Sequence, residues 1–101
     1  MGKTIAEKIL SAKSGQDAKA GDIVIVDVDV IALQDGTGPL AIDQFAVLGA
    51  TEVAKPKQTY LFIEHAAPSP RRELSNAHLL MRAFARKTGV NLSDVNGGVI
   101  H

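Results

Sequence analysis

The chain has 101 residues, of which 46% are hydrophobic, and 11 basic residues balance 11 acidic ones. This length predicts one domain spanning residues 1–101, and the zero net charge argues against nucleic acid or an anionic membrane as a partner. Cysteine is absent, which excludes disulfides and thiolate ligands for zinc or an iron–sulfur cluster. Without a signal peptide or a membrane-spanning apolar run, the sequence predicts a cytoplasmic protein.

The first predicted elements are a short helix and a long strand. Thr4-Ile5-Ala6-Glu7 fits a capping box, so we expect a helix to begin there, with Gly15 as its stop. Residues 23–33 are rich in Val and Ile, which is typical of a buried strand. Asp27 and Asp29 interrupt one face of that strand, so this face should lie near an end or at a solvated edge.

Two further helices and a second strand follow. Pro39 suits the first position of a helix, because its missing N–H is not needed there. Tyr60–Ile63 is predicted to be the second strand. Leu74, Met81 and neighbouring apolar residues at helical spacing then predict a longer helix that stops at Gly89.

The end of the chain offers two strand candidates. Val90–Leu92 is a possible short strand, and Val99-Ile100 reads as the start of a further strand. Alternating helices and strands predict an α/β fold, in which crossover helices cover a parallel sheet in a three-layer αβα arrangement.

Three of these apolar runs lead into polar side chains that handle protons or carboxylates. Residues 23–33 lead to Gln34-Asp35, the second strand leads to Glu64-His65, and Val99-Ile100 leads to His101. Neighbouring parallel strands would bring all of these groups to one edge of the sheet, where open α/β sheets bind their ligands.

The chemistry of these groups leaves alternatives open. Glu64 could raise the proton affinity of His65 and fix its tautomer, as a general acid requires. Adjacent strand residues face opposite ways, so such a pair needs a bend after the strand, and two ordinary solvated residues are the simpler interpretation of the dipeptide alone. Gln34-Asp35 could hold a substrate carboxylate or cap a turn. His101 could be a site residue or an untethered terminal one, and His78 is interpreted as structural or exposed.

A second function class comes from the turn after Asp35. Gly36-x-Gly38-x-x-Ala41 resembles a dinucleotide-binding turn, so a stand-alone α/β binding module is the alternative. Pro39 removes a backbone donor that a pyrophosphate would need, and Asp35 adds a negative charge beside it. We therefore rank nucleotide binding second.

Five stretches together resemble the start of the large subunit of 3-isopropylmalate dehydratase, homoaconitase and related members of the aconitase superfamily. They occur in the family's order and extend over essentially the whole chain. The stretches are residues 1–9, 21–29, 34–42, 64–68 and 97–101.

The resemblance implies a hydro-lyase that reversibly dehydrates 2-hydroxy di- or tricarboxylic acids, as in leucine biosynthesis, with a 4Fe-4S cluster as Lewis acid. It implies that His65 with Glu64 acts as an acid pair, that Gln34 contacts a substrate carboxylate with Asp35 beside it, and that His101 is a second catalytic histidine. The chain has Glu64 where the family usually has Asp.

The resemblance also sets expectations about what surrounds the chain. Family large subunits are several hundred residues long, so we expect an amino-terminal fragment that is inactive alone. The chain itself should bind no metal or cluster. The cluster cysteines, the serine base and the carboxylate-binding arginines would come from further sequence or a small-subunit partner. Unpaired strand edges and apolar helix faces predict self-association of the fragment.

Overall fold

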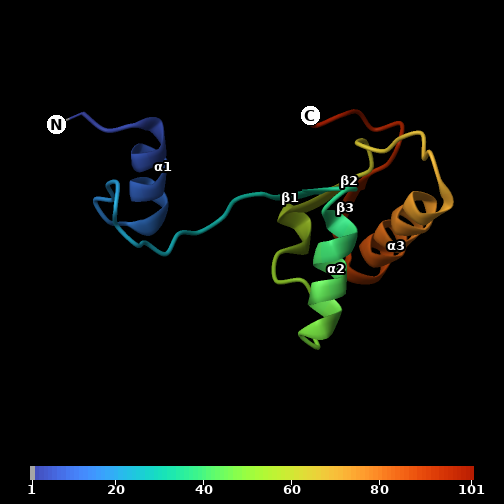
Figure 1. Ribbon diagram of the computed structural model, residues 1–101. Coiled ribbons are helices and arrows are strands. Elements are labelled where there is room, and N and C mark those ends of the chain that lie inside the picture. The colour runs from blue at the N-terminus through green and yellow to red at the C-terminus, as the bar shows by residue number, and fades with distance from the viewer. Residues whose placement is uncertain (1) are drawn as a thin grey trace.

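The structure is a computed structural model that describes residues 2–101. Figure 1 shows one helix set apart from a body that contains the sheet and the other two long helices. The elements, in chain order, are α1 (Ile5–Ser14), β1 (Ile31–Gln34), α2 (Gly38–Val47), a 3₁₀ turn (Pro56–Gln58), β2 (Thr59–Phe62), α3 (Arg72–Thr88) and β3 (Asn91–Ser93).

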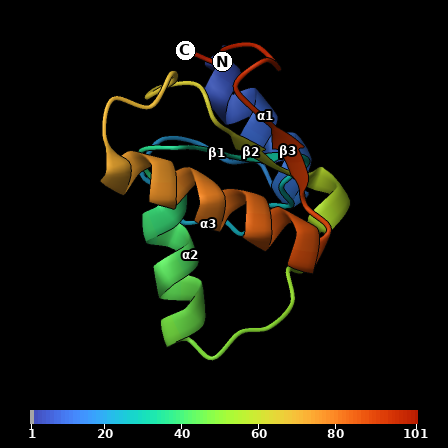
Figure 2. The same cartoon turned by 90° about the vertical axis from the view of Figure 1, so that its right-hand side faces the viewer.

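The three strands form a parallel sheet in the order β1-β2-β3, which confirms the α/β class. Leu33 of β1 lies opposite Leu61 of β2, and Gln34 lies opposite Phe62. Helices α2 and α3 cover the same face of the sheet (Figure 2) and contact each other. The rings of Phe45 and Phe84 pack edge to face, with centroids 5.2 Å apart. Within residues 2–101 the body therefore has two layers rather than the three that were expected.

The core lies between the sheet and these two helices. Its largest fully buried side chains are Leu61, Ile63 and Met81, so alternate residues of the β2 segment face the helices. Gly38, at the start of α2, would place an added Cβ 3.1 Å from Met81 Cε, so a side chain here would require the end of Met81 to shift by a few tenths of an ångström. The packing anchors β2, whose carboxyl end carries Glu64 and His65.

Helix α1 forms as its sequence predicts. Glu7 N–H donates to Thr4 Oγ1 at 3.1 Å, and Thr4 N–H donates to the Glu7 carboxylate at 2.9 Å, which completes the capping box. Gly15 ends the helix with φ of 71°, a left-handed conformation that favours glycine. None of the helices within residues 2–101 is long and apolar enough to cross a membrane.

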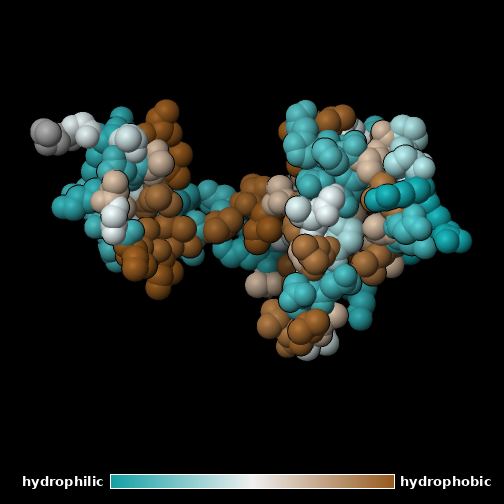
Figure 3. Space-filling model, viewed as in Figure 1, coloured by the Kyte–Doolittle hydropathy of each residue, from teal (hydrophilic) through white to brown (hydrophobic). Residues whose placement is uncertain are grey.

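The segment between α1 and β1 differs from its prediction as part of one long strand. Only Ile31–Gln34 pairs with a neighbour, whereas Ile23 and Ile25 are 98% and 91% exposed. The alternating pattern is suited to a strand, but residues 22–30 find no partner strand within the described chain. Figure 3 shows apolar side chains along this extended segment. Self-association of the chain stays a prediction.

The extended segment of residues 22–30 gives the chain an elongated shape. The radius of gyration is 16.6 Å and the longest extent is 53 Å, whereas a compact domain of 100 residues has a radius of gyration of about 13 Å. Lys13 and Asp29 form an ion pair at 2.7 Å that ties α1 to the extended segment.

The prediction of a strand at Val99-Ile100 is wrong for this structure. The third strand is Asn91–Ser93, close to the short strand considered at Val90–Leu92. Val99 and Ile100 have no strand pairing and are 68% and 46% exposed, because β3 already occupies the free edge of β2. The terminal segment instead returns as a loop toward the end of β2 (Figure 1).

Candidate functional site

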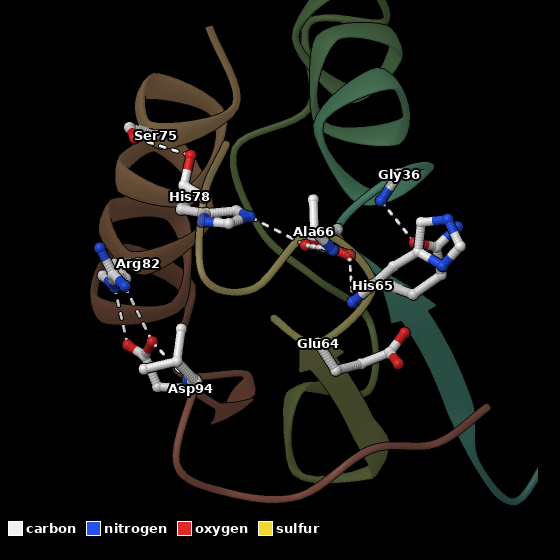
Figure 4. A network of polar contacts seen from close by, with 12 residues as sticks. Gly36, Glu64, His65, Ala66, Ser75, His78, Arg82 and Asp94 are labelled. Atoms are coloured by element: carbon white, nitrogen blue, oxygen red, sulfur yellow. Dashed lines mark hydrogen bonds and ion pairs between the residues drawn. The ribbon is translucent and has the colours of Figure 1, made fainter. Parts of the chain in front are cut away.

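Asp35 organises the loop that follows β2. Its carboxylate accepts hydrogen bonds from the backbone N–H groups of His65 and Ala66, each at 3.0 Å, and lies 2.8 Å from His78 Nε2 on α3 (Figure 4). The side chain is buried, with the whole residue 2% exposed. The residue after β1 thereby fixes the backbone at the end of β2 and connects both to α3.

The charge of Asp35 is maintained by these contacts. Burial by itself raises the pKa of a carboxyl group, because it removes the charged form from water. The hydrogen bonds from Ala66, His78 and His65 outweigh burial, and the pKa of Asp35 lies below its ordinary value. An ionised carboxylate here is a firm acceptor for the loop, but it faces protein groups. The sequence predicted that Asp35 binds substrate. In the structure its carboxylate instead supports the backbone of the loop that carries His65.

Gln34 lies at the carboxyl end of β1, and its side chain folds back over the following turn. Gly36 N–H donates to Gln34 Oε1, which fixes the amide oxygen toward the backbone. An added Cβ on Gly36 would come within 2.8 Å of Gln34 Nε2, so the fold-back needs glycine at this position. Within residues 2–101, Gln34 Nε2 donates no hydrogen bond, so this amide N–H group is available to a carboxylate at this edge.

Glu64 and His101 form a close pair at the same edge of the sheet. His101 Nδ1 lies 2.6 Å from Glu64 Oε1. The Glu64 side chain is 2% exposed, whereas that of His101 is 54% exposed. A carboxylate at Nδ1 orients the imidazole and leaves Nε2 as its outward-facing nitrogen.

His65 lies beside this pair without joining its hydrogen bond. The rings of His65 and His101 meet edge to face, with centroids 5.2 Å apart. The structure thus pairs Glu64 with His101, 37 residues away, rather than with its neighbour His65. The reason is local geometry, since adjacent residues at a strand end face different directions.

The expected meeting of polar groups is therefore observed in part. Gln34 is the last residue of β1, and Glu64 and His65 lie just beyond the carboxyl end of the neighbouring parallel strand β2, so these groups share one edge as the sequence predicted. His101 reaches them by a loop instead of a strand.

A second polar cluster supports the loop that carries His101. Arg82 of α3 donates from Nε to Asp94 Oδ2 at 2.7 Å and from Nη2 to Asp94 Oδ1 at 2.8 Å, a bidentate pair (Figure 4). Val95 N–H donates to the same carboxylate. The pair holds the chain immediately after β3, where the terminal segment turns back toward Glu64. A groove of about 570 Å³ lies between this pair and the loop at residues 67–69.

This cluster predicts an acid-sensitive contribution to stability. The hydrogen bonds from Arg82 lower the pKa of Asp94 to about 2. A carboxyl with a lowered pKa stabilises the fold above its unfolded pKa of about 3.9, and that stabilisation is lost as pH falls toward 2. We expect Asp94→Asn to lower the free energy of unfolding by about 1 kcal/mol at pH 7, the upper range for partly exposed pairs. Urea unfolding from pH 7 to pH 2 measures this.

The difference between Asp94→Asn and the unchanged chain should shrink over the acid range, because the unchanged chain loses the ionised carboxylate of Asp94 and the variant has none to lose. Arg82→Lys keeps the charge but not the two-pronged geometry, so it should also be destabilising. A difference that stays constant down to pH 2 would contradict the assignment of this pair.

Sequence reasoning gave His78 as structural or exposed without naming its partner Asp35, and it missed the contact between Arg82 and Asp94. One signal was available for His78, because Leu74, His78, Met81 and Ala85 recur at the spacing of one helix face. That face is buried in the core, and His78 is buried with it. No comparable pattern marks Arg82 and Asp94, whose contact depends on how α3 and the segment after β3 pack.

Comparison with known proteins gives homologues over the full chain. It is 54% identical over 101 residues to the 3-isopropylmalate dehydratase large subunit of Elusimicrobium minutum. It is 58% identical to large subunit 2 of Archaeoglobus fulgidus and 54% identical to large subunit 1 of Thermotoga maritima. Each alignment covers the whole chain but 24% of the relative. No family model matches.

Identity of 54–58% over the full length of the chain confirms the resemblance that the five stretches indicated. The chain spans about a quarter of the length of the curated relatives it matches. Residues 1–101 are homologous to the amino-terminal part of 3-isopropylmalate dehydratase large subunits.

Proposed function

We propose that this chain contributes part of the acid–base and substrate-binding apparatus of a hydro-lyase that acts on 3-isopropylmalate. The observation that carries the proposal is the meeting of Gln34, His65 and the Glu64–His101 pair at the carboxyl edge of a parallel sheet. The homologous large subunits, which are named for that activity, support it. Alone, the chain should be inactive, since its residues offer no complete acid–base set for the reaction.

Each group at the edge has a distinct proposed role. Dehydration of a 2-hydroxy acid needs an acid for the leaving hydroxyl, a base for the C–H proton and donors for the carboxylates. We assign proton transfer to the departing hydroxyl to His65, whose imidazole is exposed at the site. Glu64 is a positioning residue that orients His101, and His101 presents Nε2 as a second proton-handling group. Gln34 offers its amide N–H group to a substrate carboxylate.

The iron–sulfur cluster implied by the family does not fit residues of this chain. Such clusters are held chiefly by cysteine thiolates, and the chain has no cysteine. We therefore assign no step of the reaction to a cluster held here. In a complete enzyme the cluster, the base for the C–H proton and further carboxylate anchors would come from other large-subunit residues or a small subunit.

Nucleotide binding by the turn after β1 has less support. The N–H of Gly36 is already bonded to Gln34, and Gly38 packs against Met81. Packing thus accounts for both glycines of the Gly36-x-Gly38-x-x-Ala41 pattern, and the backbone donors that a pyrophosphate needs are not free at Gly36.

Gln34→Glu tests the substrate-binding assignment. The carboxylate keeps the acceptor for Gly36 N–H but replaces the amide donor by a negative charge. In the complete dehydratase, assembled from the full large subunit and the small subunit, we expect KM for 3-isopropylmalate to rise about ten-fold or more, because like charges repel. Steady-state assays of the unsaturated product measure it.

Gln44→Glu is the matched control, since Gln44 is an exposed residue of α2 that carries the same chemical change. KM should not change in the control. An unaltered KM in Gln34→Glu would remove Gln34 from the binding site, and a complete wild-type enzyme without dehydratase activity would overturn the proposed function itself.

A further inference from the structure

Glu64, His65 and His101 form a compact set of metal-ligand atoms. One carboxylate oxygen and one nitrogen from each imidazole all lie within 4.8 Å of one another. The two histidines come from segments far apart in sequence, which the fold brings together at the end of β2 (Figure 4 shows Glu64 and His65). The Glu64 side chain is buried, whereas both imidazoles are open to solvent. The cluster thus has a fixed anchor and an accessible side.

We propose that these three side chains bind a divalent first-row transition-metal ion, with Zn²⁺ as the best match. Two imidazoles and one carboxylate are a donor set that proteins use for zinc with an open fourth position. Neutral imidazole suits zinc, copper and nickel better than magnesium or calcium, which prefer oxygen ligands. The exposed side of the cluster leaves room for a water molecule as the fourth ligand. The proposal concerns the chain by itself and does not rest on the dehydratase function. It departs from the expectation that the chain binds no metal, and an ion held here would occupy imidazole nitrogens of the two histidines to which proton handling was assigned.

The surrounding structure positions two of the three ligands. Glu64 is the second residue after β2 and follows the buried Ile63. The buried Asp35 carboxylate holds the backbone N–H of His65, so the start of this side chain is also fixed. With the backbone of His65 held in this way, only its side-chain torsions need to be ordered when an ion binds.

The contact between His101 and Glu64 shows that two ligands already point to one place. His101 Nδ1 and Glu64 Oε1 are 2.6 Å apart, whereas metal bonds of about 2.0–2.2 Å in a tetrahedron separate ligand atoms by about 3.3–3.6 Å. An ion would replace this hydrogen bond by two metal–ligand bonds after a small opening of the pair. The exposed His65 ring can rotate to supply the third bond.

Cobalt substitution tests the site on the chain itself. After treatment with a chelator, titration with Co²⁺ should produce the visible absorption bands of a tetrahedral ion, and added Zn²⁺ should abolish them by displacement. His65→Ala and His101→Ala should each weaken binding at least ten-fold, because loss of a supporting contact alone costs about 10–100-fold. The double variant should lose the bands.

Glu73→Gln is the control, because Glu73 is an exposed carboxylate in the first turn of α3, outside the cluster. It should leave Co²⁺ binding unchanged. Both histidines are exposed, so their variants should fold, which far-ultraviolet circular dichroism verifies. The absence of tetrahedral bands at millimolar Co²⁺, or equal binding by the double variant, would overturn the proposal.

Discussion

Asp35→Asn should lower the free energy of unfolding of the chain by about 3 kcal/mol, since it breaks a buried charged contact and leaves hydrogen-bond donors without an acceptor. The asparagine amide has one oxygen, whereas the Asp35 carboxylate offers two oxygens to the N–H groups of His65 and Ala66 and to the His78 ring. At least one of the N–H groups of His65 and Ala66 would then face an N–H. Urea unfolding measures the loss, and a shift of the midpoint without a change in slope would identify it as a change in stability.

The same variant has a local signature that distinguishes a positioning role from a general loss of stability. Amide hydrogen exchange at His65 and Ala66 should become faster than in the rest of β2, because their acceptor has changed. Asp43→Asn on the exposed side of α2 is the matched control and should leave both measurements unaltered. Equal midpoints and equal exchange in Asp35→Asn and the parent chain would show that Asp35 does not hold this loop.

His65→Ala should reduce kcat of the complete dehydratase by about 10²–10⁴-fold, the usual contribution of a general acid. KM for 3-isopropylmalate should change much less, because the lost proton transfer occurs in the transition state. His65 is exposed, so stability should change by no more than about 0.5 kcal/mol, as for most surface substitutions. Steady-state kinetics and thermal unfolding on the same preparation separate the two effects.

A suitable control is Ser69→Ala, a small change in the loop that follows His65. It should retain turnover close to that of the parent enzyme. If His65→Ala kept normal kcat while folding normally, the proton-transfer role would have to be assigned to another group, and the Glu64–His101 pair would be the first candidate.

Local patterns predicted the features that depend on neighbouring residues. The capping box at Thr4 and Glu7 and the glycine stops at Gly15 and Gly89 formed as predicted, because each is decided within one or two helical turns. The order of helices and strands likewise indicated a parallel sheet. From these signals the sequence predicts that Gln34, Glu64 and His65 lie at one edge, as the parallel pairing of β1 and β2 places them.

Features that depend on distant partners could not be read in the same way. Alternation over residues 23–33 shows that the segment can form a strand, but pairing requires a neighbour, and only Ile31–Gln34 has one. The partner of Glu64 lies 37 residues away, so adjacency in sequence suggested His65 instead of His101. The helix pattern could indicate that His78 is buried, but its hydrogen-bond partner Asp35 comes from a different element, 43 residues away in sequence.

The most direct measurement of the shared site is the turnover of the complete dehydratase carrying His65→Ala, His101→Ala or both. If the two imidazoles serve one proton-handling site, the double variant should lose little more kcat than the more damaging single variant, because residues that act as a unit are not additive. Losses that multiply in the double variant, or normal turnover in both single variants, would contradict the account that these groups meet around one substrate.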